Sequence, residues 1–280
     1  MSKKQVLHLA AIFLIGLALF AAGKYSKAAK RKALSESFVW NGEPYDIGEV
    51  NSFDAKFAHA YDKKLSKLGT LVVLFAMGAE LCVVGAVSFF PAKDKKSAVK
   101  GLFLDAFVFV NCWLWGNGVL QLLKTAVGRI RPYMYFSNPK GHGVKGGDFC
   151  RSWPSGHCLR AFVVFGFLYF WFFYRKKNSK IRLPALCVFF LLSVCVMALR
   201  VLSGNHFVTD SLCGAAIGFL ISGAVSRPLP VYFLNIFLIV SMKLFCSGFT
   251  FSPLSSPNSF RISFCLAESF CGVSTLTRTS

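Results

Sequence analysis

The stretch LPALCVFFLLSVCVMALRVLSGNHFVTD, residues 183–210, decides the fold of this chain and locates its chemistry. Its first part, residues 183–202, is apolar and contains one charged side chain, Arg200, close to its end. A helix of about 20 apolar residues crosses the hydrocarbon core of a bilayer. The polar residues that follow, among them His206 and Asp210, are therefore expected at a membrane surface.

The same pattern of apolar runs recurs along the chain. A first apolar helix is predicted at residues 6–23, and further membrane-spanning helices at about 69–90, 101–123, 157–174, 183–202 and 207–225. The first run begins like a signal peptide, but the basic residues after it do not resemble a cleavage site, which favours an uncleaved helix. Glycine and alanine in the last span permit close helix packing. We therefore expect an all-α integral membrane bundle of about six transmembrane helices, with its active site at one membrane face.

Three parts of the chain differ in composition. Residues 1–68 are expected to form an N-terminal transmembrane helix and an extramembrane loop with a short amphipathic helix near its end. Residues 69–225 are expected to form a core of five transmembrane helices. In the remainder, 226–280, an apolar segment at 229–246 is either a seventh span or an interfacial segment, and an unstructured tail follows it.

Charge and cysteine content exclude several classes of function. The net charge of +20 comes from basic residues at the ends of apolar runs, where they meet anionic headgroups or phosphorylated substrates. Nucleic acid is not expected as a partner, because no basic stretch alternates with aromatic residues in a polar domain. Most of the cysteines lie in apolar runs and form no CxxC pair, so no metal or other cofactor is expected. Cys150 and Cys158 could pair in an oxidising compartment.

Three short polar motifs interrupt the apolar chain. They are KTAVGRIRP at 124–132, PSGH at 154–157, and the segment from Arg200 to Asp210 that contains His206. The first ends the third span, the second opens the fourth, and the third joins the fifth to the sixth. Because the chain crosses once between successive spans, all three motifs are expected at the same membrane face.

In order and spacing these motifs resemble the phosphatidic acid phosphatase type 2 (PAP2) superfamily, over roughly residues 69–225. That family includes membrane lipid phosphatases, glucose-6-phosphatase and the soluble vanadium haloperoxidases. One position departs from the family pattern, because Leu199 stands where a serine usually precedes the arginine of the third motif. This departure concerns the fine geometry of the site more than the reaction.

The resemblance implies three catalytic residues. His206 is the expected nucleophile and forms a phosphohistidine, with Asp210 fixing its tautomer from four residues away on one helix face. His157 is the expected general acid, because an imidazole can give a proton to a leaving alkoxide and later accept one from water. The alternative is a purely structural role, in which His206 caps a helix and His157 lies at the membrane interface. The presence of all three motifs favours the catalytic role.

The phosphate-binding residues follow from the same pattern. Lys124, Arg131 and Arg200 are expected to stabilise the phosphoryl oxygens, and Ser155 and Gly156 to offer polar groups at a helix start.

Other charged residues near the membrane have weaker assignments. Arg129 lies outside the family pattern and is expected to be a solvated or lipid-facing charge. Arg160 is costly in lipid unless it faces the site or a partner. Glu80 and Asp105 are expected to pair with basic groups or to be neutral within the bundle.

The expected function is hydrolysis of a phosphate monoester or pyrophosphate of a lipid, such as phosphatidic acid, phosphatidylglycerophosphate, undecaprenyl pyrophosphate or lipid A. Two alternatives stay open: a lipid phosphotransferase with the same intermediate, and a non-catalytic binder or transporter of anionic lipids. The basic loops at 93–100 and 175–182 favour a bacterial inner membrane with the site facing the periplasm or exterior, whereas the basic run at 24–32 argues against this orientation.

Overall fold

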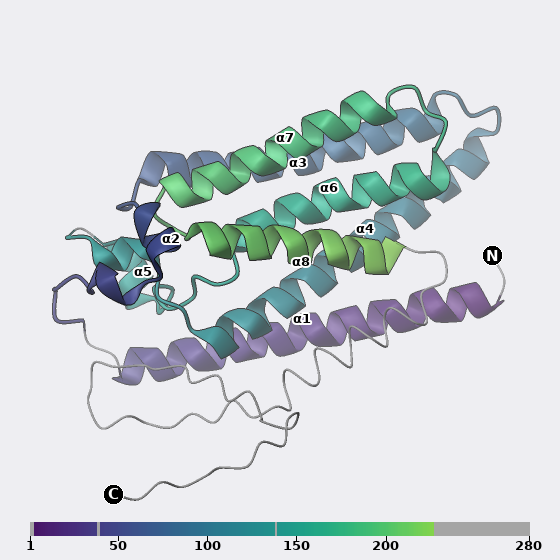
Figure 1. Ribbon diagram of the computed structural model, residues 1–280. Helices are drawn as coiled ribbons and strands as arrows, with labels where there is room; N and C mark the ends of the chain where they lie inside the picture. The colour runs from purple at the N-terminus through teal and green to yellow at the C-terminus, as the bar shows by residue number, and fades with distance from the viewer. Residues whose placement is uncertain (1–2, 38–39, 138, 227–280) are drawn as a thin grey trace, which may run out of the picture. The chain divides into compact units, whose positions relative to one another are not determined.

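The computed structural model describes residues 3–37, 40–137 and 139–226, and within them every regular element is helical (Figure 1). The long helices are α1 (Lys3–Ser37), α3 (Lys63–Phe89), α4 (Lys95–Val127), α6 (Gly156–Arg175), α7 (Arg182–Leu202) and α8 (Val208–Ser226). The shorter ones are α2 (Ser52–Lys56), α5 (Gly141–Lys145) and the 3₁₀ turns Ile47–Glu49 and Pro132–Tyr135. The expected all-α fold class is confirmed.

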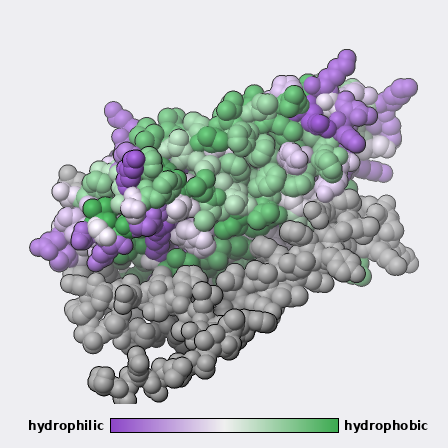
Figure 2. Space-filling model, viewed as in Figure 1, coloured by the Kyte–Doolittle hydropathy of each residue, from purple (hydrophilic) through white to green (hydrophobic). Residues whose placement is uncertain are grey.

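Six helices in the described part of the chain are long and apolar enough to cross a membrane. They cover Leu9–Leu34, Lys63–Phe89, Lys95–Tyr135, Gly156–Arg175, Arg182–Leu202 and Val208–Ser226. Large apolar side chains such as Phe75, Phe103 and Leu191 are exposed on them. Figure 2 shows an apolar band across the visible face, with hydrophilic side chains gathered at its two ends. A surface of this kind fits a lipid environment, and the chain is an integral membrane protein.

The end of the first helix differs from the prediction. α1 continues through the basic run to Ser37, although the apolar segment was expected to end at residue 23. Lysine, arginine and alanine are strong helix formers, so a change of polarity there does not end the helix. The short helix α2 begins after Asn51, whose side chain accepts a hydrogen bond from the Asp54 N–H. The predicted segment at 229–246 lies outside the described residues.

α6 is the central helix of the described bundle and packs against α3, α4, α7 and α8. Two-thirds of its span is buried inside the protein (67%), compared with 28% for α7. α8 approaches α6 most closely at Gly214 and Gly218, where an added Cβ would collide with the backbone carbonyls of Ser155 and Leu159. The small residues of this span therefore allow the close packing that the sequence predicted.

The motif-bearing ends of the helices lie together at one end of the bundle. α4 ends at Gly128, which has a left-handed φ of 64° and donates its N–H to the Lys124 carbonyl. The chain then runs through a loop to the start of α6, and a second, shorter loop joins α7 to α8. The end of α1 reaches the same region, because Arg31 Nε donates to the Gly146 carbonyl at 2.8 Å.

Candidate active site

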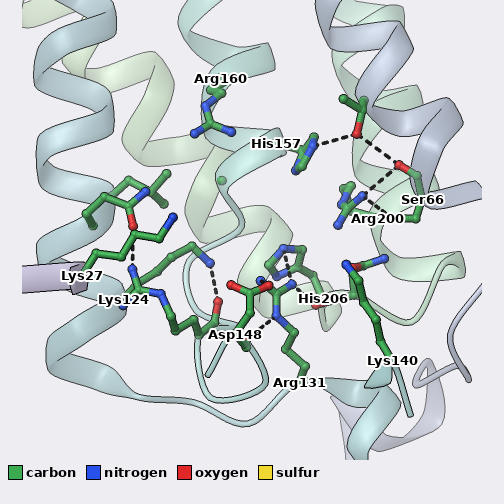
Figure 3. Close-up of a pocket in the computed structure, with 16 residues that line it drawn as sticks. Lys27, Ser66, Lys124, Arg131, Lys140, Asp148, His157, Arg160, Arg200 and His206 are labelled. Atoms are coloured by element: carbon green, nitrogen blue, oxygen red, sulfur yellow. Dashed lines mark hydrogen bonds and ion pairs between the residues drawn. The ribbon is translucent and has the colours of Figure 1, made fainter. Parts of the chain in front are cut away.

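A cavity of about 310 Å³ opens at this end of the bundle (Figure 3). Six of the eight predicted site residues line it: Lys124, Arg131, Gly156, His157, Arg200 and His206. They come from all three motifs, so the structure brings the motifs to one place as the topology predicted. Ser155 and Asp210 lie behind the cavity wall and do not line it.

His206 is almost fully buried at 2% exposure and faces the cavity with one edge of its ring. Its Nε2 lies 3.2 Å from Nη1 of Arg131, and its backbone N–H donates to the Arg200 carbonyl at 3.2 Å. Burial lowers the pKa of His206 well below its usual value, and the nearby cations Arg131, Lys124 and Arg200 lower it further. The imidazole is therefore neutral at pH 7, the form in which a ring nitrogen can act as a nucleophile.

Asp210 lies on the other side of the His206 ring. Its Oδ2 is 3.7 Å from His206 Nδ1, which is longer than a hydrogen bond, and Nδ1 has no other partner among the described residues. The carboxylate instead accepts hydrogen bonds from Ser152 Oγ (2.5 Å), Arg129 Nη1 (2.6 Å) and the Phe207 N–H (2.9 Å). These contacts fix the carboxylate beside the ring, and the predicted hydrogen bond to Nδ1 is not formed.

The prediction for Arg129 was wrong, because its guanidinium points inward. It forms ion pairs with Asp210 at 2.6 Å and with Asp54 at 2.8 Å, and lies 4.4 Å from the centre of the Phe207 ring. Gly128 ends α4 just before it and lets the chain turn toward the loop end of the bundle. The charges of these two buried carboxylates hold the Arg129 guanidinium inside the protein. The spacing of the motifs in the sequence did not indicate this contact.

Asp54 is the site-supporting residue that the sequence gave no reason to select. It is fully buried and accepts hydrogen bonds from the Thr209 N–H (3.0 Å), Thr209 Oγ1 (2.5 Å) and Asn51 Nδ2 (2.9 Å) as well as from Arg129. It thereby caps the first turn of α8 from a distant segment. Burial alone would raise the pKa of Asp54, but hydrogen bonds from Thr209, Arg129 and Asn51 outweigh it and keep that pKa low.

The three predicted phosphate-binding cations are all buried and held by the surrounding loops and by α3. Lys124 Nζ donates to the carbonyl oxygens of Arg151 and Ser152, the latter at 3.1 Å. Arg131 pairs with Asp148 at 2.9 Å. Arg200 Nη1 donates to the hydroxyl and the carbonyl of Ser66, both at 3.2 Å.

The second motif contributes Gly156 and His157 to the cavity, and Ser155 has another role. The Ser155 N–H donates to the backbone carbonyl of Asp210 at 2.9 Å, and its buried hydroxyl has no hydrogen-bond partner among the described residues. Ser155 does not line the cavity, and its N–H ties α6 to α8. Its contact with phosphate stays a prediction. His157 Nε2 lies 3.0 Å from the hydroxyl of Thr70 on α3.

Several lining residues come from segments without a motif, and sequence reasoning missed them. They are Lys27 on α1, Ser66 and Thr70 on α3, and Lys140, Asp148 and Arg151 from the loop before α6. Burial would raise the pKa of Asp148, but Arg131, Lys124 and Lys140 hold it well below its usual range. Only the high density of basic residues hinted that further cations would gather here.

The remaining charged residues and cysteines have clear positions. Arg160 lines the cavity and donates to Asn117 Oδ1, as expected for an arginine that faces the site and a partner. Asp105 pairs with Arg175 at 2.9 Å. Glu80 is buried and has no hydrogen-bond partner for its carboxyl oxygens among the described residues. Cys150 and Cys158 are free thiols.

The fold and the cavity define an integral membrane helix bundle with a strongly basic site at one end. Residues 105–230 match the model of the PAP2 superfamily, which confirms the resemblance carried by the three motifs. The match includes every motif residue and leaves out α1, α2 and α3.

A solved structure described as the first transmembrane PAP2 type phosphatidylglycerolphosphate phosphatase from Bacillus subtilis is 22% identical, with a TM-score of 0.39. The alignment covers 78% of this chain and 93% of that one. No curated protein matches the chain.

Proposed function

We propose that the protein is a membrane phosphatase that hydrolyses a phosphate monoester or diphosphate of a lipid through a phosphohistidine on His206. The observation that carries this proposal is the position of His206 Nε2, 3.2 Å from Arg131 in a cavity also lined by Lys124, Arg200 and His157. A neutral imidazole surrounded by cations suits attack on a phosphorus atom whose oxygens carry negative charge.

The reaction proceeds in two steps. His206 Nε2 forms a bond to phosphorus while the bond from phosphorus to the leaving oxygen breaks, and His157 gives that oxygen a proton. A water molecule then attacks the phosphohistidine, His157 accepts the proton of that water, and inorganic phosphate leaves with His206 restored. Lys124, Arg131 and Arg200 stabilise the charge on the phosphoryl oxygens in both steps.

The supporting residues act through these groups. Asp210, fixed by Ser152 and Arg129, stabilises the imidazolium that develops on His206. Thr70 fixes the rotation of the His157 ring.

The substrate is a lipid because the cavity opens where the membrane-spanning helices end. There the tail of an amphiphile stays in the bilayer while its phosphate enters the site. The site faces the exterior or periplasm in this proposal, because the basic loops at 93–100 and 175–182 lie at the other end of the bundle. The basic run of α1 would lie on the same side as the site, against the positive-inside rule. Its residues have other roles, because Lys24 and Lys27 line cavities and Arg31 binds the Gly146 carbonyl.

Release of phosphate from a panel of lipids by the purified protein tests this function. We expect free phosphate from at least one phosphorylated lipid, with loss of release in His206→Ala and His157→Ala. The exposed His59 lines neither described cavity, so His59→Ala is the matched histidine control. A newly phosphorylated lipid instead of free phosphate would show a phosphotransferase, and unchanged release in His206→Ala would refute the mechanism.

A further inference from the structure

The cavity carries more positive charge than one phosphate group requires. Beyond Lys124, Arg131 and Arg200, four more basic side chains line it, and Asp148 is its single carboxylate among the described residues. A phosphate monoester carries about two negative charges at neutral pH. Because like charges repel strongly in a pocket of low dielectric constant, this excess favours a ligand with further negative charge.

Two of the additional cations, Lys27 and Arg160, line a second cavity as well. That cavity has a volume of about 230 Å³, and α1, α4 and α6 form its walls. It shares Lys27, Gln121 and Arg160 with the first cavity, and no carboxylate among the described residues lines it. In Figure 3, Lys27 and Arg160 lie on the side of the pocket away from Arg200. The two cavities therefore adjoin at a pair of cations.

Both cations have capacity to bind a ligand. Arg160 donates Nε and Nη2 to Asn117 Oδ1 at 3.0 and 2.8 Å, while its Nη1 has no hydrogen bond to a described residue. The central carbon of its guanidinium lies 5.6 Å from the centre of a Trp113 ring, a cation–π contact. Lys27 is half-buried, and its ammonium group has neither a hydrogen bond nor an ion pair with the described residues.

The position of Lys27 is fixed by the packing of α1. Trp115 Nε1 on α4 donates to the Ile12 carbonyl at 3.0 Å, and Gly118 lies directly against the backbone of Leu19. At the other end of the helix Arg31 binds the Gly146 carbonyl. Lys27 lies between these anchor points, so α1 presents it to the cavity without rearrangement.

We propose that Lys27 and Arg160 form a second anion subsite, and that the preferred lipid carries a second phosphate group next to the one removed. This inference rests on the proposed phosphatase function, because the reacting phosphate occupies the first subsite. The second group is either the inner phosphate of a diphosphate or a phosphodiester in the headgroup. A lysine and an arginine beside the three motif cations supply the charge that such a substrate needs.

The test compares three substrates: a long-chain alkyl monophosphate, the matching alkyl diphosphate, and a glycerophospholipid with a headgroup phosphodiester and a terminal monophosphate. We expect kcat/KM at least tenfold higher for one of the two doubly anionic lipids than for the monophosphate. Lys27→Met should reduce that preference about tenfold. Lys64 is an exposed lysine in the first turn of α3, and Lys64→Met should preserve the preference for the doubly anionic lipid. The lipid that loses its higher kcat/KM in Lys27→Met shows whether the second group is an inner phosphate or a headgroup phosphodiester.

Binding measured without turnover separates this inference from the proposed function. In the His206→Ala background, inorganic pyrophosphate should bind at least tenfold more tightly than inorganic phosphate, and Lys27→Met should narrow that ratio. Equal effects of Lys27→Met on singly and doubly anionic ligands would overturn the second subsite even if phosphate release is confirmed. A failure of all lipids to release phosphate would refute the proposed function and leave the pyrophosphate measurement to decide the subsite.

Discussion

Asp54→Asn tests whether the loop before α3 supports the catalytic histidine. The Asp54 carboxylate is fully buried and receives hydrogen bonds from Thr209, Asn51 and Arg129, while Arg129 also pairs with Asp210 beside His206. The substitution keeps the shape of the side chain, removes its charge and points an amide N–H₂ at donors.

The expected size of the effect follows from these contacts. A hydrogen bond to a charged group contributes roughly 1.5–3 kcal/mol, and Arg129 keeps its second partner, so we expect a loss of about 2–3 kcal/mol in the free energy of unfolding. Because Arg129 also pairs with Asp210, the substitution should weaken the support of His206 as well. An increase of about 1.4 kcal/mol in the activation barrier corresponds to a tenfold lower rate.

The assay is steady-state phosphate release together with thermal unfolding in detergent. Asp54→Asn should lower kcat about tenfold with little change in KM, because Asp54 lines neither described cavity. Asp46→Asn is the control, since Asp46 is an exposed capping residue in the same loop. Wild-type kcat and stability in Asp54→Asn would refute the role of Arg129 as a link between Asp54 and Asp210.

Three further predictions concern the Thr70 contact with His157, the packing of α8 on α6, and the protonation of Asp54. Thr70→Val should lower kcat several-fold, because it removes a hydrogen bond of about 1 kcal/mol to His157, and Thr70→Ser should restore it; equal rates in both variants would contradict this positioning role. Gly218→Ala should lower the unfolding temperature by forcing α8 from the Leu159 carbonyl, whereas Gly78→Ala, which meets no atom within 4 Å, should not. The low pKa of Asp54 means that the folded state takes up its proton at lower pH than the unfolded chain. Its contribution to stability should therefore be present above about pH 4 and lost below it, and thermal unfolding of the wild type should show a steeper acid loss than that of Asp54→Asn.

The sequence predicted the spans and the motif residues because both depend on local patterns. An apolar run of sufficient length indicates a membrane helix, and one crossing per run places Lys124, His157 and His206 at the same end. Helix boundaries within basic segments were less accurate, as the extension of α1 to Ser37 shows. Lysine and arginine are strong helix formers, so a helix can continue through them beyond the apolar run.

The contacts that support the site were beyond the reach of such patterns. Asp54 and Thr209 are 155 positions apart, and no local spacing relates them. Lys27 was assigned to a flanking basic run, although the packing of α1 on α4 directs it to the cavity. The prediction for Arg129 was wrong because its partners, Asp54 and Asp210, come together only in the fold, where the loop before α3 lies next to the start of α8.

The covalent intermediate is the most direct test of the central claim. The purified protein, quenched in alkali shortly after mixing with a lipid labelled in its terminal phosphate, should retain label on His206. His206→Ala should retain none. Label that persists in His206→Ala, or phosphate release by the wild type with no trapped phosphohistidine at any quench time, would contradict attack by His206.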